Sequence, residues 1–374
     1  MKFVLAPDKY KGSLTGFEIC EALENGLRKV YPNCDIIKMP MADGGDGTID
    51  VVRYYLKADT VRVTVNDPLF RPVLASYLYS DFTKTAYIEM AEASGLKVLK
   101  DPEKNCMQTT TLGTGELIAD AIEKGAKEII LGIGGSATND AGMGMASALG
   151  FRFLDKEGKT LLPTGGNLIY VSKIDDSRLD TALSNIKVKV ACDVTNPFYG
   201  PSGAAYVYAR QKGATDEEIV LLDEGLINFA KILEKQFKVD VQKIAGAGAA
   251  GGLGAAASIF LKAQLTSGIE LVKEMAQFDA NINDADWIIT GEGKLDDQTL
   301  SGKALQGILN SAKDKGIPVA AFCGVIDISE NTARKLGLAY TVAISKDMPN
   351  LEVALKSSYK NLEAAAEEFA KSLT

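Results

Sequence analysis

Two patterns of hydrophobic positions divide the chain into three parts. In residues 1–60 and 285–374, short apolar runs alternate with longer amphipathic segments of helical period, which is typical of parallel strands joined by helices. Between them, VRVTVNDP, PVLASYLYS and TAYIEMAEAS alternate with a period of two, which predicts antiparallel strands. We therefore predict an α/β protein in which both chain ends form one parallel-sheet domain and residues 61–284 form an inserted domain with a mixed sheet.

The same periodicities predict the individual elements. Buried strands are expected at residues 2–6, 35–41, 187–192, 285–290, 317–322 and 340–344. Amphipathic helices are expected at residues 16–30, 48–56, 216–237, 302–315, 330–336 and 352–372. Ser13 or Thr15 would cap the first helix, and residues 151–162 should form a hairpin.

The segment IILGIGGSATNDAGMGMASALG, residues 129–150, combines a buried strand, a glycine-rich turn and a helix start. Four residues of types that cap helices follow the turn: Ser136, Thr138, Asn139 and Asp140. Such a turn directs backbone N–H groups and the positive end of a helix dipole at one point, which favours a phosphate or a carboxylate. The alternative is that Gly134 and Gly135 only let a helix pack closely on the sheet.

Charged side chains follow two predicted strands of the terminal domain. Asp8, Lys9 and Lys11 come after the first strand, where open α/β sheets bind ligands, and Lys11 could meet a phosphate. Asp43 and Asp46 come after the second strand and suit a metal or a substrate hydroxyl. The alternatives are a solvated turn for the lysines and an Asx turn for the aspartates.

Three further places carry candidate polar residues. Arg71, beside Pro72, could bind a carboxylate, with a surface ion pair as the alternative. Asp193 and Asn196 follow a predicted strand within ACDVTNP. Glu292 and Asp296 follow the apolar run ADWIIT, within GEGKLDDQT.

Composition and charge narrow the classes of function. The chain of 374 residues is 46% hydrophobic and has a formal net charge of −8, which argues against nucleic-acid or anionic-membrane binding. It contains no histidine, which excludes Ser-His-Asp triads and His-ligated zinc, so that carboxylates and lysines must perform the chemistry and Mg2+ is favoured over zinc. Five scattered cysteines and the absence of an export signal predict a reducing, cytoplasmic location.

One glycine run offers a different function. GAGAAGGLGAA contains a G-x-G-x-x-G pattern at residues 246–251, which would favour a dinucleotide and hence a hydroxyacid dehydrogenase. That pattern requires a preceding strand, and no clear strand is predicted there. A third hypothesis is a small-acid sensor without chemistry.

Eight segments together resemble the signature series of the bacterial class I glycerate kinases. In chain order they are KYKGSL, ADGGDGT, GTGELI, GIGGSATND, ACDVTNP, QKGA, GAGAAGGLGAA and ITGEGKLDDQT. The resemblance spans nearly the whole chain. It implies ATP-dependent phosphorylation of D-glycerate at the 2-hydroxyl, dependence on Mg2+, a flavodoxin-like domain and a larger inserted domain.

With this resemblance, each candidate residue receives an expected role. Asp193 and Lys11 are expected to act in catalysis. The residues expected to bind glycerate are Asp8, Lys9, Asp43, Arg71 and Asn196. Those expected to bind the nucleotide are Gly134, Gly135, Ser136, Thr138, Asn139, Gly291 and Glu292. Asp46 and Asp296 are expected at Mg2+ or its waters, and the only partners expected are small molecules and, as an open alternative, further copies of the chain.

Overall fold

The computed structural model describes residues 1–44, 47–179, 181–296, 303–345 and 350–374, and these residues form two compact units. Unit 1 comprises Met1–Tyr55 and Gly268–Thr374, and unit 2 comprises Leu56–Ser267. The second boundary lies earlier than the position at residue 285 that the sequence pattern predicts. The reason is that Ile269, Val272 and Phe278 pack into a core of unit 1.

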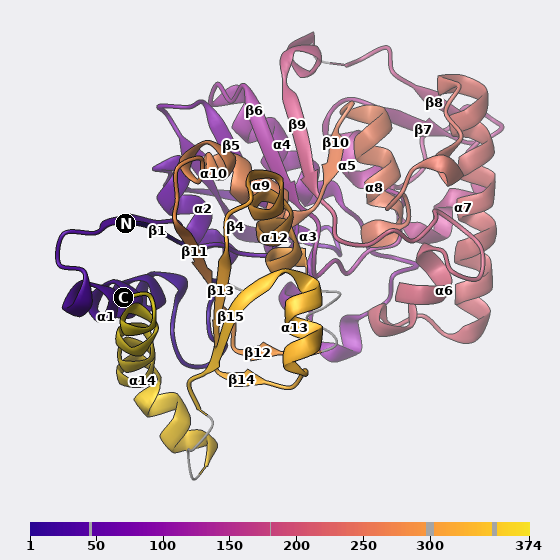
Figure 1. The fold of residues 1–374 in the computed structure, drawn as a ribbon. Helices are drawn as coiled ribbons and strands as arrows, with labels where there is room; N and C mark the ends of the chain where they lie inside the picture. The colour runs from indigo at the N-terminus through magenta and orange to yellow at the C-terminus, as the bar shows by residue number, and fades with distance from the viewer. Residues whose placement is uncertain (45–46, 180, 297–302, 346–349) are drawn as a thin grey trace. The chain divides into compact units, whose positions relative to one another are not determined.

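Unit 1 is built on a five-stranded parallel sheet in which β1 (Lys2–Leu5) is an interior strand (Figure 1). β1 pairs in parallel with β2 (Asp35–Lys38) on one side and with β11 (Trp287–Thr290) on the other. β13 (Val319–Cys323) and β15 (Leu338–Ala343) extend the sheet beyond β11. In chain order this is the arrangement 2-1-3-4-5 of flavodoxin-like folds, with its topological switch point between β1 and β11.

Helices cover both faces of this sheet, and the remaining elements of unit 1 follow in chain order. They are α1 (Gly16–Val30), α2 (Thr48–Leu56), α9 (Gly268–Met275), α10 (Phe278–Asn281), β12 (Lys294–Leu295), α12 (Lys303–Lys315), β14 (Val325–Ile326), α13 (Glu330–Leu336) and α14 (Leu351–Ser372). The two end segments of the chain, α1 and α14, lie side by side in Figure 1. Phe3 and Leu5 pack in the core with these two helices, whereas Val4 faces the opposite core, as strand alternation requires.

Unit 2 is built on a six-stranded mixed sheet in the order β10-β9-β6-β5-β4-β3. Its strands are β3 (Asp59–Asn66), β4 (Pro72–Ser80), β5 (Thr85–Glu89), β6 (Glu128–Gly132), β9 (Lys187–Ala191) and β10 (Gln264–Thr266). The predicted antiparallel pairing of β3, β4 and β5 is confirmed. β5, β6, β9 and β10 run parallel, so their carboxyl ends lie at the same edge of the sheet.

Shorter elements and helices complete unit 2. The helices are α3 (Ala91–Ser94), α4 (Leu112–Glu123), α5 (Met143–Ala148), α6 (Ala204–Tyr208), α7 (Asp216–Phe237) and α8 (Ala249–Phe260). The predicted hairpin strand at β7 (Arg152–Leu154) pairs chiefly with β8 (Lys173–Asp175), and only Leu154 bridges back to Thr160. Short 3-10 turns include η3 (Gly165–Tyr170), η5 (Arg210–Lys212) and η6 (Val241–Lys243).

Sequence patterns located several helices to the residue. α1, α2, α7 and α13 have the predicted bounds, and Thr15 caps α1 by accepting a hydrogen bond from the backbone N–H of Glu18. Strand ends differ more, because pairing stops before the apolar run does. After β2, for example, Met39 and Met41 still donate backbone hydrogen bonds to Leu5 and Pro7 in irregular geometry.

The glycine run at residues 246–251 begins a kinked helix. A 3-10 turn, η6, precedes it in place of the strand that a dinucleotide site requires. Ala250, Gly251 and Gly252 have left-handed backbone angles within α8. A Cβ at Gly251 would lie 2.2 Å from the carbonyl oxygen of Thr138, so this glycine allows close contact between two backbones. The dinucleotide hypothesis is therefore wrong for this segment.

Among the described helices, none combines the length and the apolar character that crossing a bilayer requires.

Candidate functional site

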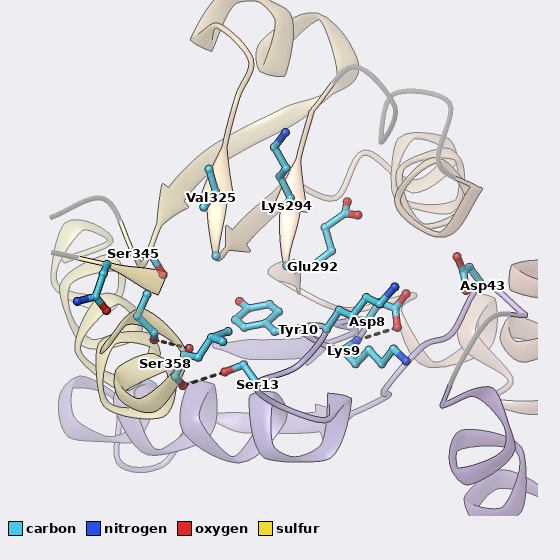
Figure 2. A pocket seen from close by; sticks show the side chains of 16 residues that line it. Asp8, Lys9, Tyr10, Ser13, Asp43, Glu292, Lys294, Val325, Ser345 and Ser358 are labelled. Atoms are coloured by element: carbon cyan, nitrogen blue, oxygen red, sulfur yellow. Dashed lines mark hydrogen bonds between the residues drawn. The ribbon is translucent and has the colours of Figure 1, made fainter. Parts of the chain in front are cut away.

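A cavity of about 810 Å³ lies in unit 1, at the carboxyl edge of its parallel sheet (Figure 2). Segments that follow β1, β11, β13 and β15 all line it, together with the first turns of α14. The switch point between β1 and β11 therefore opens into the cavity, as expected for ligand sites in open parallel sheets. Its volume is in the range of sites for cofactors and drug-sized ligands, about 300–1,000 Å³.

Backbone hydrogen bonds hold the lining segments in register. The N–H of Asp8 donates to the carbonyl of Gly291 at 2.9 Å, which joins the ends of β1 and β11. The N–H of Gly324 donates to the carbonyl of Glu292 at 3.2 Å, and that of Ser345 to Gly324 at 3.1 Å. These backbone hydrogen bonds connect the lining segments to one another, so they help to hold the side chains of this edge in position.

Six charged residues line the cavity: Asp8, Lys9, Lys11, Asp43, Glu292 and Lys294. Figure 2 shows Asp8, Lys9 and Asp43 toward one end, and Ser13, Ser345 and Ser358 toward the other. Carboxylates and ammonium groups therefore share one end of the cavity. Such a mixture suits a phosphorylated ligand, with lysines binding its charge and carboxylates contacting a hydroxyl or a cation.

Asp8 has a perturbed carboxyl group in this cavity. Burial, with a smaller contribution from the negative charge of Asp43, raises the pKa of Asp8 to about 6. The backbone N–H of Lys9 donates to its Oδ1 at 2.7 Å and, with the Lys9 ammonium, opposes that rise in pKa. A carboxyl group with a raised pKa in a cavity is suited to exchange protons with a bound ligand.

The opposite end of the cavity is walled by Tyr10 and α14. The Tyr10 hydroxyl donates to the carbonyl of Phe322 at 2.8 Å, which fixes the ring between the two ends. The Ser13 hydroxyl donates to the carbonyl of Leu355 at 3.0 Å and so ties the β1–α1 loop to α14. Ala354, Leu355 and Ser358 face the cavity from this helix.

The sequence pattern predicted residues of the charged end of the cavity but none of the other end. Asp8, Lys9, Lys11, Asp43 and Glu292 come together in the cavity, and Gly291 lies directly before Glu292. Asp296 follows β12 and pairs with Lys294 at 3.0 Å, and Asp46 lies outside the described residues. Lys294 lies within GEGKLDDQT, the segment that also contains Glu292 and Asp296. The α14 residues gave no signal, because they lie inside an ordinary amphipathic helix.

The glycine-rich turn after β6 forms a second candidate site, in unit 2. Gly134 and Gly135 are exposed, and a Cβ at Gly134 would meet no atom within 4 Å. Gly135 has a φ of +71°, which favours glycine. The backbone of this turn is therefore open to a ligand. β9 pairs in parallel with β6, with Gly132 opposite Ala191, so Asp193 leaves the sheet at the same edge.

The helix that follows this turn differs from the predicted one. α5 has only six residues, and its N-cap is Gly142, not one of the four predicted polar residues. Asp140 is fully buried and accepts hydrogen bonds from the N–H groups of Gly142 and Gly144 and from both donors of Thr111. The first N–H groups of α5 are thus occupied by a carboxylate of the chain. The helix-dipole part of the anion-binding argument is wrong, and the exposed glycines remain.

Lys212 is a buried residue of this site that the sequence analysis did not select. Lys212 is 2% exposed, and its ammonium donates to the Ser136 hydroxyl and the Thr138 carbonyl, each at 2.7 Å. Burial lowers the pKa of Lys212 to about 8, against the opposing influence of Cys106 and Asp140. Its position within the quoted QKGA segment was the available signal. The two hydrogen bonds of Lys212 therefore hold the turn in its conformation.

Three predicted residues beside this turn are buried: Ser136, Thr138 and Asn139. Neither polar atom of the Asn139 side chain has a hydrogen-bond partner, and neither does the Thr138 hydroxyl. An unpaired buried polar group costs about 1–3 kcal/mol. Bound water or a ligand group would remove that cost.

Two other predicted residues make internal contacts. The Arg71 guanidinium pairs with Asp67 and with Glu103, each at 2.7 Å, which is the ion pair considered as its alternative. The Asn196 side chain donates to the carbonyl of Ser202 and accepts from the Tyr208 hydroxyl at 2.6 Å. Both residues therefore support loops of unit 2, and any role in binding glycerate stays a prediction.

Comparison with known proteins identifies relatives along the full length. A family model described as the glycerate kinase family matches residues 3–374. A glycerate kinase of Bacillus cereus is 45% identical over 370 residues, which cover 99% of this chain and 97% of that protein. A glycerate 2-kinase of Escherichia coli (strain K12) is 40% identical over 373 residues, covering 100% and 98%. The crystal structure of a provisional glycerate kinase 2 from Salmonella typhimurium LT2 has a TM-score of 0.89 and 42% identity, covering 100% and 98%.

Proposed function

The chain belongs to the glycerate kinase family, and from that membership we propose that it transfers the γ-phosphoryl group of ATP to D-glycerate. The products would be ADP and 2-phosphoglycerate, and Mg2+ would be required. The observation that supports this proposal most strongly is the match over the full chain, including the 40% identity to a glycerate 2-kinase. It removes the reason for the dehydrogenase and sensor hypotheses.

The two candidate sites contain the groups that phosphoryl transfer needs. Because this reaction has a loose transition state, catalysis depends on positioning and on stabilisation of charge at the phosphoryl oxygens. Lys9, Lys11 and Lys294 offer positive charge in unit 1, and the exposed residues Gly134 and Gly135 offer backbone for hydrogen bonds in unit 2. We assign Lys11 to the transferring phosphate and Asp193 to the glycerate hydroxyl. We also propose that the protein acts in the cytoplasm.

The acidic residues present fit Mg2+. The described residues include no cluster of three or more acidic or cysteine side chains that could hold a metal alone. Mg2+ commonly uses only one or two carboxylates and takes its other ligands from phosphates and water. Asp296, with Asp46 outside the described residues, would hold the ion, which would supply positive charge to offset that of the phosphates.

The proposal is tested with purified protein, ATP, Mg2+ and D-glycerate. Release of ADP that depends on glycerate, with 2-phosphoglycerate as the product in a 31P NMR spectrum, is the expected result. A product spectrum of 3-phosphoglycerate would overturn the position of transfer. Absence of glycerate-dependent ADP would overturn the activity itself.

Lys11→Ala should raise the KM for ATP or for glycerate, by about tenfold, because an exposed lysine that lines the cavity would no longer contact the anion. Initial rates at varied concentrations of each substrate measure the effect. Lys335→Ala, at an exposed lysine of α13 outside the cavity, is the matched control. Unchanged KM values for both substrates would show that Lys11 does not bind either of them and lies in a solvated turn.

Gly134→Val should reduce kcat/KM by about tenfold or more with little change in melting temperature, because the added side chain has room but covers the exposed backbone. Gly135→Val is the comparison: its φ of +71° adds strain, so both activity and melting temperature should fall. Normal kinetics for Gly134→Val would remove this turn from the binding site.

Asp296→Asn should shift the Mg2+ concentration for half-maximal rate upward by about tenfold, because a neutral amide is a weaker ligand for a hard cation. A Mg2+ titration at saturating ATP measures this shift. Identical titration curves for the variant and the unsubstituted protein would contradict the assignment and leave Asp296 as the ion-pair partner of Lys294.

A further inference from the structure

The unit 1 cavity is much larger than the acid that the family phosphorylates. Glycerate is a three-carbon acid, whereas the cavity has a volume of about 810 Å³. Sites generally bury most of the ligand surface against their walls, at volumes of about 300–1,000 Å³ for ligands of drug size. Glycerate alone would leave most of the volume to water. The dimensions suit a ligand with several connected groups.

The two ends of the cavity also differ in chemistry. One end holds the charged residues around Asp8 and Lys9, and the other lies against α14 (Figure 2). We call the second region the α14 end and define it by Tyr10, Val325, Ala354, Leu355 and Ser358. It presents an aromatic ring, aliphatic side chains and a hydroxyl, and its nearest charged lining residue is Lys294, which pairs with Val325 between β12 and β14 (Figure 2). An uncharged, partly apolar group such as a purine would fit there.

We propose that the α14 end binds the nucleoside of a nucleoside triphosphate, while the phosphates extend toward Lys9 and Lys11. This inference rests on the proposed kinase function. The order of groups along the cavity matches the order of groups in such a ligand, from base and ribose to the negative phosphates. The position agrees with the rule that open parallel sheets bind nucleotides at the switch point between neighbouring strands.

The walls of the α14 end are held in place before any ligand binds. Tyr10 is 4% exposed, and its hydroxyl is fixed to the carbonyl of Phe322. The Ser13 hydroxyl holds the backbone of Leu355, and the Ser358 hydroxyl donates to the carbonyl of Ala354 at 2.8 Å. These contacts use the backbone of α14 and leave the Leu355 side chain as part of the wall. A prearranged wall reduces the ordering cost of binding.

The test enlarges a wall residue and measures two ligands. Leu355→Trp should weaken ATP binding by about tenfold or more, because the indole occupies the space of the nucleoside. Affinity for inorganic tripolyphosphate should change by less than about twofold, because the charged end is unaltered. Isothermal titration calorimetry with Mg2+ and without glycerate gives both affinities. Val353→Trp, at an exposed α14 residue that does not line the cavity, should leave both unchanged.

A second variant protects the test against misfolding. Val325 is 47% exposed, so Val325→Trp adds the same bulk from the opposite wall without disturbing a core. Unchanged ATP affinity in both variants would overturn the inference, as would an equal loss for ATP and tripolyphosphate. A rise only in the KM for glycerate would assign this end to the acid instead. If the unsubstituted protein neither binds ATP nor phosphorylates glycerate, the proposed function fails, which is a separate outcome.

Discussion

Asp193→Asn is expected to lower kcat by about 10²- to 10⁴-fold while ATP affinity and melting temperature stay nearly unchanged. Asp193 follows β9 at the edge of the unit 2 sheet where the exposed Gly134–Gly135 turn also emerges, since Gly132 and Ala191 are paired in the two strands. An asparagine has the same shape but cannot accept the proton of a glycerate hydroxyl. Steady-state kinetics and calorimetric binding of ATP separate the two quantities.

The control for Asp193→Asn removes the same charge elsewhere in unit 2. Asp176 is an exposed aspartate on the same unit, so Asp176→Asn should leave kcat within about twofold of the unsubstituted value. If Asp193 has only a structural role, Asp193→Asn should lower the melting temperature and leave kcat unchanged, because the variant loses a carboxylate that caps a turn. An Asp193→Asn protein with a lowered melting temperature and an unchanged kcat would overturn the catalytic assignment.

Asp140→Ala should cause the largest loss of stability, roughly 3–5 kcal/mol, because four buried donors would lose their acceptor together. These donors are the N–H and hydroxyl of Thr111 and the N–H groups of Gly142 and Gly144, at 2.8–3.2 Å from the carboxylate. The residue is fully buried, so water cannot replace the lost acceptor at little cost. The midpoint of urea unfolding, followed by far-UV circular dichroism, measures the change.

A conservative variant at the same position sharpens this expectation. Three of the four donors bond to Oδ2 and only Gly142 bonds to Oδ1. Asp140→Asn can place its amide oxygen at the position of Oδ2, where three donors bond. Its NH2 group then faces only the N–H of Gly142, with which it cannot form a hydrogen bond. Its loss should therefore be smaller, about 1–2 kcal/mol. Equal losses for the two variants, or an unchanged midpoint in Asp140→Ala, would show that this hydrogen-bonded centre does not hold the loop together.

Local periodicity predicted the helices better than it predicted the polar turns. α7 begins and ends where its pattern does because Thr215 caps it and its apolar face is continuous. The turn after β6 gave an incomplete signal: Asp140 accepts from the N–H groups of Gly142 and Gly144 at the helix start, but it also accepts from both donors of Thr111, far away in the sequence. Contacts of this kind depend on how α4 packs beside α5, which no local pattern contains.

The candidate sites were predictable to different degrees for the same reason. Residues that follow strands, such as Asp8 and Glu292, could be selected because parallel strands bring their carboxyl ends to one edge. Leu355 and Ser358 could not, since they line the cavity only through the docking of α14 beside α1. Lys212 illustrates a third case, because its contacts with Ser136 and Thr138 join residues more than seventy positions apart.

The division of unit 1 into two separate chain segments has a consequence for folding during synthesis. β1 pairs with β2 on one side, but its other neighbour, β11, is translated only after the whole of Leu56–Ser267. Unit 2 is continuous, so it can fold on the ribosome while β1 and β2 still lack their partner, which reverses the usual N-terminal-first order. Until β11 is made, β1, which contains Phe3, Val4 and Leu5, has one unpaired edge. The nascent chain should therefore depend on chaperones most strongly before β11 emerges.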